Sequence, residues 1–221
     1  KIKLNKKTYW SSYEDENSYS NDSMQKKEEI VSNFVKDFNL ENVLDLGCNT
    51  GKFSEKSFTA GAKRVIGLDF DSGAIDFACQ KKFFVDKNFT PLVYDLANPS
   101  PSLGWNLKER IPIKERMKNI DGLICLALIH HLTFSKNIPL VDTINFLSKL
   151  AKYALLEFVP KEDEMVVSLL QNREDVFLDY NLQNFQNYMS KNYEILSIID
   201  IPSSSRKFFI GKSLNYDTNR N

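Results

Sequence analysis

Cysteine and histidine are scarce in this chain, and their scarcity limits the kinds of site that it can build. The three cysteines, Cys48, Cys79 and Cys125, lie in separate predicted elements and show no C-x-x-C spacing. This pattern argues against a disulfide framework or a zinc cluster and favours a reducing compartment. The two histidines, His130 and His131, are adjacent, and no cysteine or clustered acid stands near them at ligand spacing, so we predict no metal site.

The chain also lacks an excess of charge of either sign and a long apolar run. Its 29 lysines and arginines balance 29 aspartates and glutamates. Without an overall positive field the chain has no general attraction to nucleic acid or to an anionic membrane, which argues against both as partners. No apolar run reaches the roughly 18 residues that a membrane span needs, and no signal-peptide pattern opens the chain. We therefore predict a cytoplasmic protein without a membrane anchor.

The length and composition fit one globular domain with a sizeable core. We assign this domain to residues 33–213, between an amino-terminal segment, 1–32, and a polar tail, 214–221. The first segment is polar and carries scattered aromatic residues that need a surface to cover, so it is predicted to be an arm or lid. These aromatic residues are Tyr9, Trp10, Tyr13 and Tyr19. A partly disordered leader is the alternative. Because the first residue is Lys1 and not Met, a domain of a larger protein is one interpretation of the chain.

Two glycines mark a sharp turn from a predicted buried strand to a predicted helix. Gly47 and Gly51 permit positive φ and let a ligand approach the backbone, while free N–H groups of the following helix face that ligand. The dinucleotide pattern G-x-G-x-x-G would place glycines where this chain has Asn49 and Lys52. An acid, Asp45, stands two residues before the first glycine and suits a ligand that carries an ammonium group. A junction with two purely structural glycines is the alternative.

Strands and helices alternate through the rest of the chain. After the glycine turn the apolar patterns predict strands over 64–69, 91–96, 120–128, 153–160, 193–199 and 206–211. Helical spacing predicts helices over 24–38, 73–82, 139–150, 161–170 and 179–189. With the strand before Gly47, seven strands are expected. The alternation is typical of a parallel α/β sheet.

Acids end two of these predicted strands. Asp69 lies 18 residues past Gly51, close to where the acid of a nucleoside-binding βαβ unit takes the ribose hydroxyls. One carboxylate suits two vicinal hydroxyl donors. The alternative role for Asp69 is to cap the next helix, but Asp71 and Ser72 are better placed to do so. Asp95 ends the third predicted strand in the same way.

The pattern Asp45-x-Gly47-x-x-x-Gly51 resembles motif I of the class I methyltransferases that use S-adenosylmethionine, whose usual form is (D/E)-x-G-x-x-x-G. The resemblance extends over nearly the whole chain. It implies a Rossmann-like, seven-stranded, mostly parallel sheet with a carboxyl-terminal antiparallel hairpin and helices on both faces. It also implies that Asp95 receives the adenine amino group and that the backbone of Leu96 meets the ring edge. The expected contacts with S-adenosylmethionine are Asp45, Gly47, Cys48, Asn49, Gly51, Asp69, Phe70, Asp95, Leu96 and Leu126.

Three segments resemble, more narrowly, a bacterial subgroup of nodulation-protein-related methyltransferases. They are the segments 126–132, 157–161 and 172–177. The substrates of that subgroup are poorly defined. This second resemblance therefore supports the cofactor and says little about the acceptor.

His130, His131 and Glu157 are the candidates for contact with the acceptor. The histidines end the predicted strand 120–128 and Glu157 lies in the next strand, so their side chains can converge at the sheet edge where ligands bind. An imidazole of ordinary pKa, near 6.5, takes a proton at neutral pH. Adjacent residues of a strand point to opposite sides, so we expect one histidine, by preference His131, to face the pocket. The alternatives are histidines that only pack, and an ion pair between Glu157 and a lysine or arginine.

These patterns together predict methyl transfer from S-adenosylmethionine to an oxygen or nitrogen of a small-molecule, glycan or carrier-bound acceptor. The sulfonium is already a good leaving group, so the protein mainly has to position the reactants in line. A base is needed only for a weakly acidic hydroxyl. Two alternatives remain open: a methyltransferase that acts on RNA or protein, and a methyltransferase-like binding module that has lost catalysis.

Overall fold

The computed structural model describes residues 21–171, 174–201 and 204–216. Residues 1–20 of the predicted amino-terminal arm, which include its four aromatic residues, therefore lie outside the described residues. Helix α1 (Asn21–Asp37) is continuous through position 32, where the sequence analysis placed a domain boundary. In the described part of the chain, no helix is long and apolar enough to cross a membrane.

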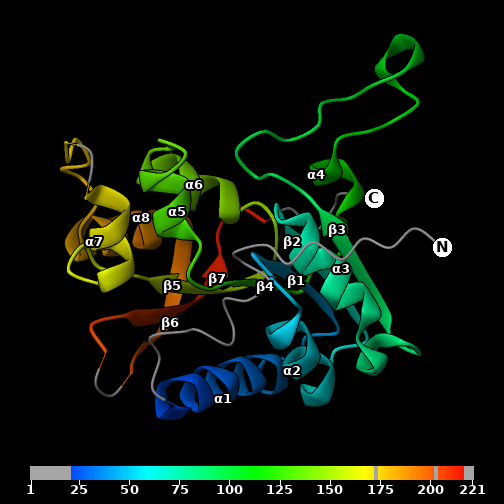
Figure 1. The fold of residues 1–221 in the computed structure, drawn as a ribbon, viewed down its shortest axis with the longest axis horizontal. Helices are drawn as coiled ribbons and strands as arrows, with labels where there is room; N and C mark the ends of the chain where they lie inside the picture. The colour runs from blue at the N-terminus through cyan, green and yellow to red at the C-terminus, as the bar shows by residue number, and fades with distance from the viewer. Residues whose placement is uncertain (1–20, 172–173, 202–203, 217–221) are drawn as a thin grey trace.

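Seven strands form one sheet in the order β3-β2-β1-β4-β5-β7-β6 (Figure 1). Their bounds are β1 (Asn42–Leu46), β2 (Arg64–Asp69), β3 (Asn88–Val93), β4 (Gly122–Cys125), β5 (Tyr153–Phe158), β6 (Tyr193–Asp200) and β7 (Lys207–Ser213). The first five strands pair in parallel, and β7 runs antiparallel to both β5 and β6. The predicted fold is confirmed. Strand order reverses beside β1, and open α/β sheets bind ligands at such a point.

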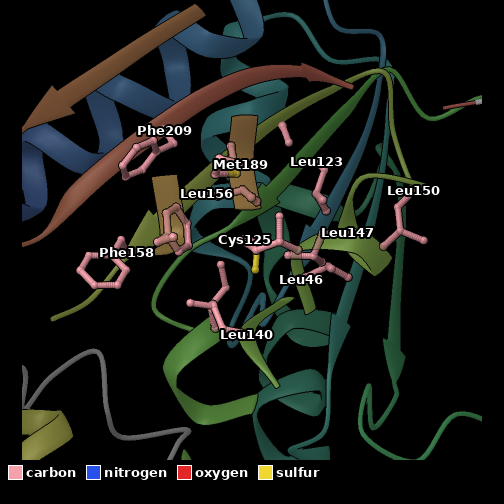
Figure 2. Close-up of a cluster of buried hydrophobic side chains, with 14 of the residues drawn as sticks. Leu46, Leu123, Cys125, Leu140, Leu147, Leu150, Leu156, Phe158, Met189 and Phe209 are labelled. Atoms are coloured by element: carbon pink, nitrogen blue, oxygen red, sulfur yellow. The ribbon is translucent and has the colours of Figure 1, made fainter. Parts of the chain in front are cut away.

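Helices cover both faces of this sheet. The helices after α1 are α2 (Lys52–Ala60), α3 (Ser72–Gln80), α4 (Ile113–Arg116), α5 (Ile129–Phe134), α6 (Leu140–Leu147), α7 (Glu164–Leu170) and α8 (Leu182–Asn192). One hydrophobic cluster joins apolar residues of α1 to one face of the central strands. The other cluster joins α6 and α8 to the opposite face (Figure 2).

The two-residue period of the strands decides which side chain meets which helix layer. In β5, Ala154 and Leu156 belong to the cluster with α6 and α8, whereas Leu155 belongs to the cluster with α1. Because successive strand residues point to opposite faces, Glu157 points to the same face as Leu155. The sheet therefore directs a buried carboxylate toward α1.

The connection after β4 differs from the prediction. The strand ends at Cys125, Ala127 adopts a positive φ of 48°, and α5 begins at Ile129. His130 and His131 thus lie in the first turn of a helix, with ring centroids 4.2 Å apart, and not on opposite sides of an extended segment. The strand predicted over 120–128 is present but shorter, and its expected extension to Leu128 was wrong. A short buried apolar run has the same pattern in a strand and in a buried helix, so the pattern does not mark where the strand ends.

Candidate active site

The turn from β1 to α2 forms the centre of the site. Gly47 and Gly51 have φ values of 73° and 84°, and Asn49 also lies in the left-handed region at 49°. Glycine adopts this region without strain, and asparagine tolerates it better than most residues. The N–H groups of Gly47 and Cys48 donate to the carbonyl oxygen of Leu68 at 2.8 and 3.1 Å, so the turn is fixed against β2.

A cavity of about 370 Å³ opens at the carboxyl ends of β1, β2 and β4. This volume lies in the range of small-molecule and cofactor sites. Residues assigned to the cofactor from the sequence that line the cavity are Gly47, Cys48, Asn49, Asp69, Phe70, Asp95, Leu96 and Leu126. His131 also lines it. The sequence analysis did not single out Lys27 and Lys136, which belong to the same wall.

Asp69 ends β2 with its carboxylate held by two backbone donors. The N–H of Asn49 donates to Oδ2 at 2.8 Å, and the N–H of Asp71 donates to Oδ1 at 2.9 Å. Burial raises the pKa of this carboxyl, and the two backbone hydrogen bonds oppose that rise. An ionised carboxylate has about four acceptor positions, so both oxygens can accept further hydrogen bonds from a ligand. The side chain of Asp71 caps α3 by accepting a hydrogen bond from the N–H of Ala74. Asp69 is therefore not the capping residue of this helix.

Asp95 lies two residues beyond the end of β3. Its Oδ1 accepts the N–H of Ala97 at 2.9 Å, and its Oδ2 lies 3.3 Å from Nζ of Lys136. The Lys136 ammonium is also 5.8 Å from the ring centroid of Phe70, a side chain that is half exposed. Together these residues form a polar and aromatic rim at one end of the cavity.

Two residues assigned to the cofactor from the sequence, Asp45 and Gly51, are not on the cavity wall. Asp45 is buried and accepts a hydrogen bond from the Ser54 hydroxyl at 2.7 Å, which joins β1 to α2 behind the turn. A β-carbon at Gly51 would lie 3.1 Å from the ring of Phe84, and the positive φ there also favours glycine. Both residues therefore stabilise the turn and do not face the cavity.

The histidines occupy different depths. His131 lines the cavity, whereas His130 is only 1% exposed and lies behind it. Burial lowers the pKa of His131 to about 4 and lowers the pKa of His130 well below its usual range. Both rings are therefore neutral at pH 7. A neutral imidazole accepts a hydrogen bond well, but with so low a pKa it is a weaker base than the sequence analysis assumed.

The low pKa of His131 makes stability depend on pH in a defined direction. The unfolded chain takes up a proton below pH 6.5, whereas the folded chain does so only near pH 4, so stability is lost as the pH falls between these values. From pH 7 to 5, this residue should account for about 2 kcal/mol of lost unfolding free energy. Urea unfolding of the wild type and of His131→Asn at both pH values measures the difference. An equal loss in the two proteins would contradict the prediction.

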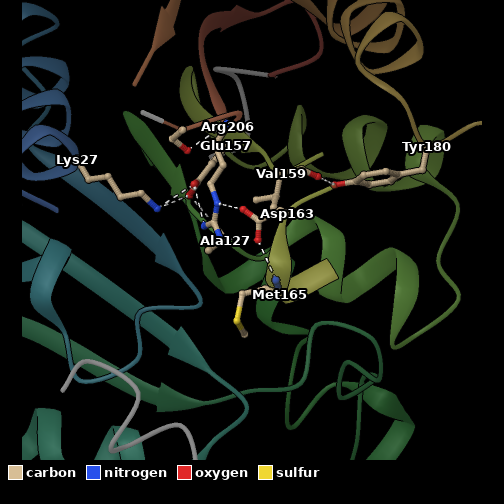
Figure 3. A network of polar contacts seen from close by, with 9 residues as sticks. Lys27, Ala127, Glu157, Val159, Asp163, Met165, Tyr180 and Arg206 are labelled. Carbon is tan, nitrogen blue, oxygen red and sulfur yellow. Dashed lines mark hydrogen bonds and ion pairs between the residues drawn. The ribbon is translucent and has the colours of Figure 1, made fainter. Parts of the chain in front are cut away.

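Glu157 lies outside the cavity wall, in a buried network of charges (Figure 3). Its Oε1 is 2.8 Å from Nζ of Lys27 and 3.3 Å from Nη1 of Arg206, and its Oε2 accepts the N–H of Ala127 at 2.8 Å. Arg206 also forms a two-pronged pair with Asp163, at 2.6 and 2.9 Å. Glu157 therefore forms the ion pairs with lysine and arginine that the sequence analysis gave as the alternative to contact with the acceptor.

The sequence analysis missed Lys27, although the helical spacing contained a signal. Lys27 precedes Ile30 by three residues and Val31 by four, which places it on the buried face of α1. A lysine on such a face needs a buried partner.

No group of three or more histidine, cysteine, aspartate or glutamate side chains that could hold a metal ion occurs among the described residues.

No protein-family model matches the chain. The chain is 37% identical over 209 residues to nodulation protein NoeA of Rhizobium meliloti (strain 1021). The match covers 95% of this chain but 44% of NoeA, so the chain spans less than half the length of this relative. A shorter match, 46% identical over 57 residues, covers 25% of the chain and 26% of the uncharacterized protein MJ0284 of Methanocaldococcus jannaschii.

Solved structures with a similar fold include two that contain a bound nucleoside. One is N-methyltransferase NodS from Bradyrhizobium japonicum WM9 in complex with S-adenosylhomocysteine, which superposes on this chain with a TM-score of 0.63 at 12% sequence identity. The match covers 93% of this chain and 98% of the NodS chain. Magnesium protoporphyrin IX methyltransferase (ChlM) from Synechocystis PCC 6803, with bound S-adenosylmethionine, superposes with a TM-score of 0.60 at 20% identity. That match covers 89% of this chain and 86% of ChlM. At these identities the likeness establishes a shared fold.

Proposed function

We propose that this chain, which has the fold of the class I methyltransferases and is similar in sequence to NoeA, uses S-adenosylmethionine to methylate an oxygen or nitrogen of a small-molecule, glycan or carrier-bound acceptor. The observation that carries the proposal is the carboxylate of Asp69 at the cavity. Two backbone N–H groups hold it there, beside the glycine turn. Such a fixed carboxylate suits the two ribose hydroxyls of the cofactor.

The other wall residues fit the same cofactor. Asp95 can accept the adenine amino group, and the half-exposed ring of Phe70 offers a flat surface. Gly47, whose positive φ favours glycine, has no side chain that could obstruct the ligand. Apolar side chains such as Leu126 line the cavity between these polar groups. When bound, S-adenosylmethionine supplies a methyl group activated by a sulfonium.

The protein's part in the transfer is mainly to orient the acceptor. A ring nitrogen of neutral His131 can accept a hydrogen bond from an acceptor O–H or N–H and direct its lone pair toward the methyl group. A pKa of about 4 limits His131 as a base, so an acceptor that is already nucleophilic at neutral pH, such as an uncharged amine, suits the site best. The resemblance to ChlM supports an acceptor of small-molecule size.

Transfer of labelled methyl groups tests the proposal. The purified chain is incubated with methyl-labelled S-adenosylmethionine and, separately, with the small-molecule, glycan, RNA and protein fractions of a bacterial extract. Label is expected in the small-molecule or glycan fraction, and at a cofactor concentration near the wild-type Kd it should be strongly reduced with Asp69→Ala. Label confined to RNA or protein would favour the macromolecular alternative. Cofactor binding without label in any fraction would favour a binding module.

With an acceptor identified, replacing His131 by alanine should slow methyl transfer about 100-fold. The expected cause is the loss of an orienting hydrogen bond, so the affinity for S-adenosylhomocysteine should stay near that of the wild type. Single-turnover rates and calorimetric titration measure the two quantities separately. A near-normal rate in His131→Ala would make this histidine a wall residue without a part in transfer.

A further inference from the structure

We propose that a basic loop of one copy of this chain binds an acidic segment of a second copy. The loop is part of the connection between β3 and β4, residues 98–118, and is called the projecting loop. The acidic segment follows β5 and consists of residues 161–171 and 174–179. The inference goes beyond the proposed function and does not depend on it.

The projecting loop stands away from the rest of the molecule, at the upper right of Figure 1. Its outer part is an ordered turn, in which Leu103 and Arg110 exchange two backbone hydrogen bonds of 2.9 and 3.0 Å. A short helix, η3 (Trp105–Leu107), lies between them. Leu107 has a positive φ of 54°, which is uncommon for a residue with a β-carbon, and such strain is concentrated at functional sites. The loop thus presents a defined shape at a distance from the sheet.

The projecting loop is both apolar and basic at its surface. Trp105 is 84% exposed, and Leu107 and Ile111 are also exposed. The loop contains five lysines and arginines against two glutamates. Four of its cations are exposed and have no ion-pair partner among the described residues: Lys108, Arg110, Arg116 and Lys118. Tryptophan and arginine are among the residues that most often dominate protein interfaces.

The acidic segment has the opposite charge and a similar apolar character. Residues 161–179 include six aspartates and glutamates against two basic residues. Asp163 and Asp175 form ion pairs. The other four acids have no ion-pair partner in the part of the chain that the structure describes: Glu162, Glu164, Glu174 and Asp179. Leu178 is 84% exposed, and Val167 and Val176 are more than half exposed.

The acidic segment is held against the body of the molecule. Nζ of Lys161 is 2.6 Å from Oδ2 of Asp175 and donates to the carbonyl oxygen of Phe177 at 2.7 Å. The ring of Phe177 packs against the hydrophobic cluster with α6 and α8. Asp163 caps α7 by accepting a hydrogen bond from the N–H of Met165. The outward side chains therefore form a fixed surface, which needs little ordering when a partner binds.

The two surfaces are complementary, but they lie far apart within one copy. They follow β3 and β5, and the strands β2, β1 and β4 lie between these two in the sheet. Figure 1 shows the projecting loop at the upper right and α7 at the left. The contact that joins them is therefore one between copies.

A second copy accounts for both surfaces at once. Nucleic acid or an anionic membrane would suit the projecting loop but would leave the acidic segment uncovered. In a contact between copies the opposite charges attract, and the exposed apolar side chains on both sides are removed from water. Two copies related by a two-fold axis make the contact twice, and this closes the assembly as a dimer.

Size-exclusion chromatography with light scattering measures the mass of this chain in solution. The wild type should have the mass of two copies, twice the 25.5 kDa of one chain. Trp105→Ser and Leu178→Ser should each weaken the dimer about 30-fold or more, the effect of truncating a central interface residue. Val85→Ser is the matched control, because Val85 is 75% exposed and belongs to neither surface, and it should leave the dimer unchanged. Circular dichroism verifies that these surface variants are folded.

Mixing the two weakened variants tests which surfaces meet. Trp105→Ser keeps an intact acidic segment and Leu178→Ser keeps an intact projecting loop, so the mixture should form a pair that neither variant forms alone. Sedimentation equilibrium should show weaker association than in the wild type, because this pair makes one contact in place of two. Dimers of Leu178→Ser alone would show that loop meets loop. Dimers of Trp105→Ser alone would show that the loop has no part, and either result would overturn the proposal.

Reversal of charge tests the electrostatic part of the contact. Lys108→Glu/Arg116→Glu and Glu162→Lys/Glu174→Lys should each be monomeric, and the chain that carries all four substitutions should dimerise again. A fourfold variant that stays monomeric would overturn the pairing of the two surfaces. A wild type that is monomeric at every concentration would overturn the proposal outright. If that monomer sedimented with phosphatidylglycerol vesicles, the projecting loop would be assigned to a membrane surface instead.

Discussion

Replacing Asp69 by alanine is expected to weaken the binding of S-adenosylhomocysteine by about 2 to 3 kcal/mol, or roughly 30- to 150-fold. The carboxylate is fixed by the N–H groups of Asn49 and Asp71, so its oxygens are oriented before a ligand arrives. A ligand that donates two ribose hydroxyls to it makes charge-assisted hydrogen bonds, and alanine removes both. Calorimetric titration of the folded variant measures the loss.

The control for this experiment is Asp86→Ala. Asp86 is exposed and is not part of the cavity wall, so its variant should bind as the wild type does. Circular dichroism of both variants confirms that the fold is retained. Unchanged affinity in folded Asp69→Ala would remove Asp69 from the cofactor site.

Replacing Glu157 by alanine is expected to lower the unfolding free energy by about 3 to 5 kcal/mol. The substitution removes the buried carboxylate that both Lys27 and Arg206 contact, and it removes the acceptor of the Ala127 N–H. Domains of this kind are stable by only about 5 to 15 kcal/mol, so the loss is a large part of the total. Denaturant unfolding measures the effect as a fall in the midpoint concentration.

The matched control is Glu29→Ala. Glu29 pairs with Lys26 at 2.8 Å on the exposed side of α1, and exposed pairs of this kind contribute about 0 to 1 kcal/mol. The double variant Lys27→Met/Glu157→Gln should be less destabilised than Glu157→Ala, because it leaves the Arg206–Asp163 pair balanced. If Glu157→Ala lowered the unfolding free energy no more than Glu29→Ala does, the buried network would contribute no more to stability than an exposed ion pair.

Features set by short stretches of sequence were predictable. Gly47 and Gly51 mark the turn because both backbone positions require positive φ, and Asp69 follows from the length of one βαβ unit. The apolar runs and the helical spacing placed the strands and helices along the chain, and the resemblance to the class I methyltransferases supplied the arrangement of the sheet. What these features share is that each depends on residues close together in the chain.

Features that depend on distant pairing were not predictable in the same way. Lys27 and Glu157 are separated by 130 positions, and no local pattern states that α1 and β5 meet. The depth of His131 in the fold sets its pKa, and burial of a polar ring is not visible from its neighbours in sequence. The helical turn that carries both histidines was missed because an apolar run fits a strand equally well.

The most direct measurement is a crystal structure of this chain grown with S-adenosylhomocysteine. The expected result is one nucleoside in the cavity, with both ribose hydroxyls on the Asp69 carboxylate and the adenine beside Asp95 and Leu96. Its amino-acid end should point toward Gly47 and Ala127. An empty cavity at saturating ligand, or a ligand bound away from Asp69, would contradict the assignment of this site to S-adenosylmethionine.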